Sequence, residues 1–443
     1  MALIVQKFGG TAVAGAERIR SVARRVAARR AAGDEVVVVV SAMGSETDEL
    51  LDLAGRVAAG PQGRELDVLV TAGERKSTAL VALALQGEGW PARSFTGAAA
   101  GIRTDESHAQ ARIVGVQAGD VWASLRRGEV PVVAGAQGLS LGGDETFLGR
   151  GGSDTTAVAL AHELGADACQ LYTDVDGVYT ADPRLVPGAQ RIKRVSWEAM
   201  LEMCASGCPK PDSRAVEVAQ DHGVTIEVRS AFGEAEGSTI GPAPGSAAAS
   251  RAGSAAGSTV GRGEEATQER WLVSAVSQDV SEAMVTVSRL PADAGTVTNL
   301  FHALAAHDVD VDMIVKNSAL DDGLVSVSFT TPKATLDAAV KLCEGVTADL
   351  PAARVGVRSD IGKVSVLGAG LRGHPGVAAR MLRVLADRGA DVELIGTSPI
   401  RMSCVIDEAE ATGAVRALHE AFELGTPVDA GAAGPATGEV PAR

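Results

Sequence analysis

Five consecutive valines at residues 36–40 constrain the fold of this 443-residue chain more than any other feature. A continuous β-branched run is typical of a strand buried on both faces, and such strands occur mainly in parallel sheets covered by helices. The preceding residues fit this arrangement, with a short apolar strand at 3–8, glycines at 9–10 and a helical stretch at 16–30. Strand, glycine-rich loop, helix and strand make a βαβ unit, so the N-terminal half is predicted to be an α/β domain.

Polar residues follow the predicted strands of this half at several points. Because ligands bind at the carboxyl ends of strands in open parallel sheets, these residues are expected to converge on one site. Residues 68–75 are predicted to form a further loop or the start of a helix, and they place the Glu74 carboxylate among small residues. The strand-end residues are Lys7, Ser41, Gln137, Arg150 and Thr173.

The segment 148–156 is the most glycine-rich of these loops. Its three glycines leave the backbone free to approach a ligand closely. Arg150 offers a planar guanidinium that suits a carboxylate or a phosphate. Asp154 and two threonines then precede an apolar run, as at a helix N-terminus, where anions bind favourably. The segment is predicted to bind an anionic small molecule, and a glycine-rich turn with a capping Asp154 is the alternative for this loop taken alone.

The chemistry that these loops suggest is phosphoryl transfer, which depends mainly on positioning and on positive charge against the transferring group. Lys7 and the amides of Gly9 and Gly10 would supply that charge. Asp174 and Asp176 would hold a hydroxyl of the nucleotide or a water bound to Mg²⁺.

Charge and cysteine content exclude several classes of function. The net charge of −15 argues against nucleic acid and anionic membranes as partners. No apolar run has the roughly 18 residues of a membrane span, and the first residues lack the pattern of a signal peptide. Five scattered cysteines fit reduced thiols in a cytoplasmic protein. Cys204 and Cys208 are predicted to be buried thiols, and no metal site is predicted.

Five motifs in order resemble those of aspartokinases, the amino-acid-kinase-fold enzymes that phosphorylate the side-chain carboxylate of L-aspartate. They lie at residues 7–13, 41–44, 71–74, 149–156 and 172–184. The resemblance extends through the C-terminal half and therefore covers nearly the whole chain. It implies a three-layer sandwich around a mostly parallel sheet, with ATP and Mg²⁺ as cofactors and 4-phospho-L-aspartate and ADP as products.

The same resemblance implies a role for individual residues. Lys7 and Asp154 would be catalytic, with Lys7 stabilising the transferring phosphoryl group and Asp154 organising the site. Residues implied to bind the substrate are Ser41, Thr47, Glu74, Arg150, Gly151, Gly152 and Ser153. Residues implied to bind ATP are Lys7, Phe8, Gly9, Gly10, Thr173, Asp174, Tyr179, Arg184 and Lys210.

The chain departs from the family pattern at a few positions. Glu46 replaces a threonine, Ala99 a glutamine and Ala136 a phenylalanine, so another amino-dicarboxylate is an alternative acceptor. The family's nucleotide lysine is displaced by one position to Lys210. Pro209 precedes it, which leaves a catalytically idle regulatory subunit as a further alternative.

An internal repeat marks the C-terminal half. Gly295 and Gly376 are 81 residues apart, as are Ile314 and Ile395. Each copy begins as strand, glycine loop, helix and strand, the start of a βαββαβ module, and the pair resembles tandem ACT domains. The expected division is a kinase domain at 1–232, a flexible linker at 233–270, ACT modules at 271–350 and 360–428, and a disordered tail at 429–443.

The resemblance also implies partners for these modules. ACT modules usually pair between subunits, so a homodimer or higher oligomer is expected. Lysine and threonine are the implied effectors, although Lys316 stands where the family has a glutamine and would repel lysine.

Overall fold

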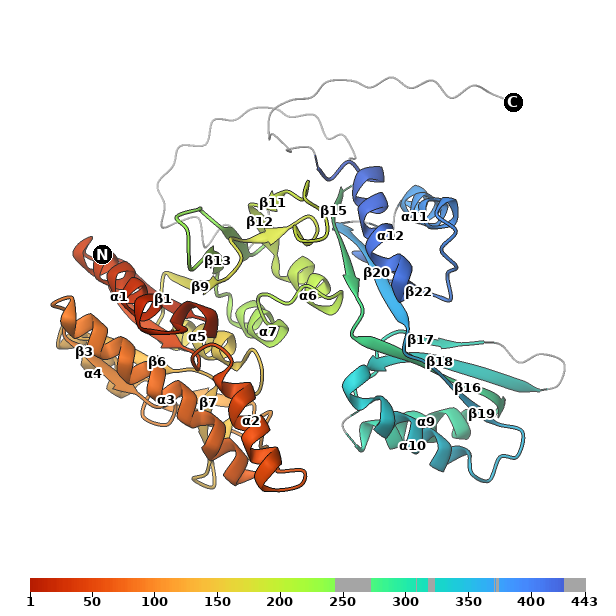
Figure 1. The fold of residues 1–443 in the computed structure, drawn as a ribbon, viewed down its shortest axis with the longest axis horizontal. Helices are drawn as coiled ribbons and strands as arrows, with labels where there is room; N and C mark the ends of the chain where they lie inside the picture. Colours follow the sequence, from red (N-terminus) through yellow and green to blue (C-terminus); the bar gives the residue numbers. More distant parts are fainter. Residues whose placement is uncertain (244–271, 308, 318–322, 370, 372–373, 426–443) are drawn as a thin grey trace, which may run out of the picture.

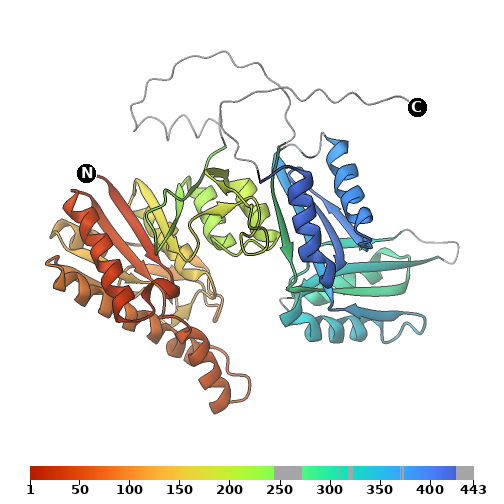
Figure 2. The same cartoon turned by 45° about the horizontal axis from the view of Figure 1, so that its top comes forward.

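The computed structural model describes the chain except residues 244–271, 308, 318–322, 370, 372–373 and 426–443. The N-terminal half, coloured red to green, and the C-terminal half, coloured green to blue, form two lobes that lie side by side (Figure 1). The turned view in Figure 2 shows the same separation, with the central sheet of the first lobe between its helices. Within the described residues, no helix combines the length and apolar character needed to cross a membrane.

An eight-stranded sheet organises the first lobe. Its strands are β1 (Leu3–Phe8), β2 (Glu35–Val40), β3 (Ala92–Phe95), β6 (Val130–Ala134), β9 (Ala168–Thr173), β12 (Arg194–Ser196), β13 (Ile226–Ser230) and β14 (Ser238–Gly241). The order is β12-β14-β13-β9-β1-β2-β6-β3, and only β13 and β14 pair antiparallel. The mostly parallel sheet predicted from the sequence is confirmed.

The valine run lies in β2, near the middle of this sheet. Val37 and Val39 belong to the apolar core on one face, whereas Val36, Val38 and Val40 belong to the core on the other face. Helices α1 (Ala16–Ala31) and α3 (Arg64–Gly87) cover the second face. The first is covered by α4 (Gly119–Arg126), α5 (Gly152–Glu163), α6 (Trp197–Ala205) and α7 (Ser213–His222). Helices, sheet and helices therefore form the predicted three layers.

Smaller elements surround the end of the sheet that carries the predicted site. A 3₁₀ turn, η1 (Gly10–Val13), follows β1, and α2 (Glu46–Val57) follows the loop after β2. A four-stranded sheet has the order β5-β4-β7-β8 and contains β4 (Ile102–Thr104), β5 (Ile113–Val116), β7 (Gln137–Ser140) and β8 (Glu145–Phe147). The strands β10 (Val178–Tyr179) and β11 (Arg191–Ile192) pair as a small ribbon.

The structure refines three local predictions for this lobe. Residues 68–75, predicted as a loop or the start of a helix, are helical and lie inside α3, which begins four residues earlier at Arg64. Gly73 lets this helix approach the loop after β2, since a Cβ there would lie 2.9 Å from that of Ala42. Gln137 follows β6 of the main sheet, as predicted, and begins β7. The glycine-rich segment is also more helical than expected, because α5 begins at Gly152.

The second lobe consists of two ferredoxin-like modules, as predicted. One sheet has the order β17-β18-β16-β19 and contains β16 (Glu282–Pro291), β17 (Ile314–Lys316), β18 (Leu324–Pro332) and β19 (Arg354–Arg358). The 3₁₀ turn η3 (Lys333–Thr335) and helices α9 (Ala294–Ala305) and α10 (Leu336–Thr347) accompany it. The other has the order β15-β20-β22-β21 and contains β15 (Leu272–Asp279), β20 (Ile361–Ala369), β21 (Leu394–Thr397) and β22 (Arg401–Asp407), with helices α11 (Pro375–Asp387) and α12 (Glu408–Ala421).

Strand pairing divides the chain differently from the predicted boundaries. The strand β15 lies in the range expected for the first module but pairs with β20 of the second, and β19 of the first module lies beyond residue 350. The predicted linker begins too early, because β14 belongs to the main sheet and buries Ile240. The rest of that linker from residue 244, and the predicted tail at 429–443, lie outside the described residues.

The two lobes contact each other through α6 and the segment after β10. Thr180 accepts a hydrogen bond from the backbone of Val276 in β15 at 2.8 Å. Glu202 of α6 pairs with Arg401 of β22 at 3.0 Å. Ala181 and Val186 are buried in the apolar core of the second ACT-type module. The lobes are therefore joined by both polar and apolar contacts.

Candidate active site

A buried ion pair lies at the centre of the candidate site. Lys7 is near the end of β1, and Asp154 is in the first turn of α5. Lys7 Nζ and Asp154 Oδ1 are 2.6 Å apart, and both side chains are buried. Burial alone would raise the pKa of Asp154, but the charges of Lys7 and Lys210 and two hydrogen bonds outweigh it and hold that pKa below its usual value. Asp154 is therefore ionised beside Lys7.

The loop between α6 and α7 adds a second lysine to this centre. Lys210 lines a small pocket together with Lys7, Asp154 and Thr173. The backbone N–H of Asp212 donates to Asp154 Oδ2 at 3.3 Å. The displaced lysine of the family motif thus lies beside the Lys7–Asp154 pair.

Asp212 is a second carboxylate close to this pair. It caps α7 by accepting from the N–H of Arg214 at 3.1 Å. Burial and the charge of Asp154 raise its pKa. A Cβ on Gly151, whose φ is +77°, would lie 2.1 Å from the Asp212 carboxylate, so this position requires glycine.

The glycines after β1 allow loops to approach one another. The N–H of Gly9 donates to the carbonyl of Tyr172 at 3.2 Å. A Cβ on Gly10 would lie 2.8 Å from the carbonyl oxygen of Ala42. Phe8 stacks on Tyr172 with 4.8 Å between ring centroids. These contacts hold the ends of β1, β2 and β9 together beside Lys7.

Glu74 of α3 is a buried carboxylate that can accept a further hydrogen bond. Its Oε1 accepts from the N–H of Ala42 at 3.2 Å. Its Oε2 is buried and has no hydrogen-bond partner among the described residues. Burial, with a contribution from the nearby charge of Glu46, raises the pKa of Glu74 to about 7. A ligand ammonium group would supply both the missing hydrogen bond and the missing charge.

The loop after β2 brings the other predicted substrate residues close to Glu74. The carbonyl of Ser41 accepts from Ser77 Oγ of α3 at 2.7 Å. Thr47 lies in the first turn of α2 and is half-buried. Glu46, at the position where the family has threonine, pairs with Lys76 of α3.

Arg150 is exposed, in contrast to the buried Lys7 and Asp154. Its side chain is 83% exposed, and its guanidinium contacts Asp48 of α2 at 2.6 Å. Gly152 and Ser153 are buried in the first turn of α5. A Cβ on Gly135 would lie 2.5 Å from Ser153 Oγ, so the loop after β6 packs directly on this turn. Arg150 is thus held on a rigid base but is free to exchange Asp48 for a ligand anion.

Three of the residues predicted to bind ATP contact neighbouring aspartates. Thr173 Oγ1 donates to Asp174 at 2.9 Å. The Tyr179 hydroxyl donates to Asp176 at 2.6 Å, and burial together with that carboxylate raises the pKa of Tyr179 to about 12. Arg184 is exposed and pairs with Asp182 at 2.7 Å. The structure therefore brings Thr173 to Lys7 and Lys210, whereas Arg184 lies on the surface.

Three polar residues near the site were not predicted. Asp212 and Arg214 follow the displaced lysine, and Asp67 lies seven residues before Glu74 on α3. Helical spacing is the signal that points to Asp67, because residues seven apart lie on the same helix face. A loop or helix start at 68–75 leaves Asp67 outside the predicted helix, whereas α3 begins at Arg64.

Comparison with known proteins identifies the family of this fold. The amino acid kinase family profile matches residues 2–230, and an ACT domain profile matches residues 364–422. The aspartokinases of Mycolicibacterium smegmatis and Corynebacterium glutamicum are each 45% identical over 427 residues, which are 96% of this chain and 97% of theirs.

Solved structures show the same fold over 95% or more of the chain. The aspartate kinase from Synechocystis has a TM-score of 0.75 and 29% identity, and the match covers 100% of both chains. Aspartokinase III of E. coli, solved with aspartate and ADP, has a TM-score of 0.78 and 24% identity and covers 95% of this chain and 99% of its own.

The α/β sandwich with its buried lysine–carboxylate pair is that of an amino acid kinase. Within that class, the chain belongs to the aspartokinase family. The resemblance drawn from the five motifs is confirmed.

Proposed function

We propose that this protein transfers the γ-phosphoryl group of ATP to the side-chain carboxylate of L-aspartate and forms 4-phospho-L-aspartate and ADP. The observation that carries the proposal is the buried Lys7–Asp154 pair, with Lys210 beside it, at the strand ends of an aspartokinase-family fold. Similarity over 96% of the chain to aspartokinases supports the same activity.

The ionisation state of the acceptor decides which kind of catalysis the side chains must provide. The side-chain carboxylate of aspartate is ionised at neutral pH, so no general base is needed to activate it. Lys7 and Lys210 would neutralise charge on the transferring phosphoryl group. Asp154 would orient Lys7 through their 2.6 Å contact.

The two ends of aspartate would be held by opposite charges. Glu74 would accept the α-ammonium with its unpartnered Oε2, and Arg150 would exchange Asp48 for a substrate carboxylate. Ser41, Thr47 and the turn at Gly151, Gly152 and Ser153 would complete the acceptor site. The nucleotide would lie along Phe8, Gly9 and Gly10 on one side and Thr173, Asp174, Tyr179 and Arg184 on the other.

The residues of this site fit an Mg²⁺ ion that is bound mainly by the phosphates of the nucleotide. Among the residues that the structure describes, no group of three or more His, Cys, Asp or Glu residues could hold a metal ion. Mg²⁺ commonly binds to phosphate oxygens, waters and one or two carboxylates. Asp154 and Asp212 are the carboxylates near Lys7 and Lys210. When bound, the ion would neutralise charge on the phosphates.

We extend the proposal to partners and location. A cavity in the second ACT-type module, lined in part by His374, Ser398 and Arg401, is a candidate site for a lysine or threonine effector. The protein is proposed to be a cytoplasmic homodimer or higher oligomer that pairs through its ACT modules. Size measurements with and without each amino acid test this part independently of activity.

An acceptor panel tests the function itself. The protein is incubated with ATP, Mg²⁺ and one acceptor, and acyl phosphate is trapped with hydroxylamine, with lysine and threonine added in parallel. Aspartate should give the highest kcat/KM. The Glu46–Lys76 pair beside Glu74 favours the second candidate, a kinase for another amino-dicarboxylate, which a higher kcat/KM for that acceptor would establish. ATP binding without turnover on any acceptor would instead indicate an idle regulatory subunit.

Thr180, which follows β10 in the kinase lobe, contacts the second ACT-type module, and this contact gives a separate prediction. Thr180 Oγ1 and His419 Nε2 are 2.9 Å apart, and burial lowers the pKa of His419, so the imidazole is neutral. Thr180→Val should destabilise the protein by about 1–3 kcal/mol by leaving a buried ring nitrogen unsatisfied. It should also raise KM for ATP a few-fold, measured by steady-state kinetics. Thr347→Val in α10 is the matched control, and an equal rise there would contradict this role for Thr180.

A further inference from the structure

One face of α3 carries a line of buried polar residues. Asp67, Thr71, Glu74 and Ser77 are spaced four, three and three residues apart and are all at most 3% exposed. Such spacing places them on a single helix face. Most members of this line contact loops of the candidate site: Ser77 and Glu74 bind the loop after β2, and the carbonyl of Thr71 accepts from Gln137 at 3.2 Å.

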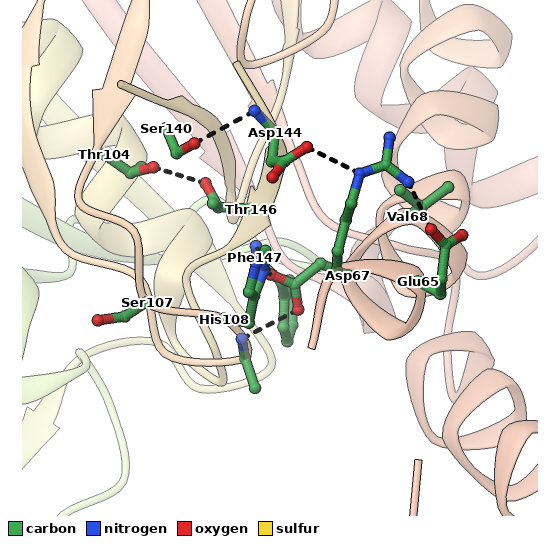
Figure 3. A network of polar contacts seen from close by, with 12 residues as sticks. Glu65, Asp67, Val68, Thr104, Ser107, His108, Ser140, Asp144, Thr146 and Phe147 are labelled. Atoms are coloured by element: carbon green, nitrogen blue, oxygen red, sulfur yellow. Dashed lines mark hydrogen bonds and ion pairs between the residues drawn. The ribbon is translucent and has the colours of Figure 1, made fainter. Parts of the chain in front are cut away.

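Asp67, at the other end of this line, has contacts that the proposed mechanism does not use. Its Oδ2 accepts from the N–H of Phe147 in β8 and lies 2.9 Å from His108 Nδ1, and its Oδ1 accepts from the N–H of Ala109. Figure 3 shows this carboxylate between the helix and the two chain segments. One carboxylate, 1% exposed, thereby ties α3 to residues 108–109 and to the end of β8.

These two segments support the loop that carries Arg150. Phe147 is three residues before Arg150, and a Cβ on Gly149 would lie 3.1 Å from the carbonyl oxygen of Ala109. Arg214 of α7 reinforces the same junction from the other side, because it donates to the carbonyl of Leu148 at 2.7 Å and to that of Ala111 at 2.8 Å. The base of the Arg150 loop is therefore fixed between a carboxylate and a guanidinium.

We propose that Asp67 is a positioning residue for acceptor binding: it fixes the base of the Arg150 loop on the same helix that carries Glu74. Seven residues separate Asp67 and Glu74, about 10 Å along a helix, so α3 sets the spacing between the two charged ends of the acceptor site. This inference rests on the proposed function, because it assigns Glu74 and Arg150 to opposite ends of aspartate.

Asp67→Asn is the direct test. Asparagine keeps one acceptor oxygen but turns an N–H group toward backbone donors, which loosens the loop. KM for aspartate should rise about ten- to a hundredfold, since a displacement of about 1 Å at a reacting centre costs this much, while KM for ATP stays unchanged. Asp144→Asn is the matched control, because Asp144 (Figure 3) lies in the turn between β7 and β8 and not at the base of the Arg150 loop. Its carboxylate pairs with Arg64 at 2.8 Å.

A second variant keeps the inference testable if Asp67→Asn fails to fold. His108→Gln disturbs one of the three contacts and should raise KM for aspartate by a smaller factor, with a melting temperature close to that of the wild type. A loss of melting temperature and active fraction with an unchanged KM for aspartate would show a purely structural role and overturn the inference. Failure of the proposed function is distinguishable, because the wild-type protein would then show no turnover of aspartate.

Discussion

Replacing Lys7 with methionine should lower kcat by a factor of about 10² to 10³ or more. The substitution removes the charge that we propose faces the transferring phosphoryl group, and the loss of one preorganised donor in a buried site typically has an effect of this size. The proposed aspartate site is formed by other residues, so KM for aspartate should change little. Hydroxylamine trapping under saturating ATP measures the loss, and near wild-type kcat would refute the role given to Lys7.

The same substitution should also weaken the fold, which requires a control. Without Lys7, Asp154 is a buried carboxylate that has lost its main counter-charge, and such a loss costs about 3–5 kcal/mol. The double variant Lys7→Met with Asp154→Asn removes both charges and should recover most of the stability in urea unfolding. It should remain inactive. Recovery of stability without recovery of kcat separates the chemical role from the structural one.

Glu74→Gln should raise KM for aspartate by a factor of about 30 to several thousand. Truncating one partner of a buried charge pair costs about 2–5 kcal/mol, and here the lost partner is the carboxylate that would bind the ammonium group. The free protein should become more stable at the same time. Ionising Glu74 in the fold, where its pKa is about 7 instead of 4.5, corresponds to roughly 3 kcal/mol that glutamine avoids.

The raised pKa of Glu74 fixes the direction of two pH effects. The folded protein holds this proton more tightly than the unfolded chain, so its stability without ligand falls as pH rises from about 4.5 to about 7. KM for aspartate should fall over pH 6 to 8, because only the ionised carboxylate attracts the ammonium group. Both trends should disappear in Glu74→Gln. A KM that depends on pH equally in the variant would contradict this assignment.

The parts of the fold that follow from local pattern were predictable. The valine run required burial on both faces, and alternate valines do enter the two separate cores. Lys7 and Asp154 lie about 150 residues apart in the sequence, and only the resemblance to a family suggested that they meet. Burial then makes the contact obligatory, since an unpaired charge at either position would be costly.

The features that were missed depend on contacts between distant segments. Residues 68–75 were predicted as a loop or the start of a helix, whereas they lie inside α3, where Gly73 allows the helix and the loop after β2 to pack closely. Asp67 has no motif of its own, and its importance appears only when residues 108, 109 and 147 converge on it. The position of Lys210 beside Asp154 likewise depends on the path of the loop between α6 and α7.

The pairing of β15 with β20 gives the regulatory lobe a nested architecture. The first ACT-type module, from β16 to β19, is inserted between the first and second strands of the other module. Both ends of the outer module return to one residue of the kinase lobe, because the backbone of Val276 and the carbonyl of Leu424 both hydrogen-bond to Thr180. A shorter polypeptide made from an internal start codon would build both sheets completely only if translation began before Leu272. One that began at β16 would leave an edge of β20 open to pairing with another chain.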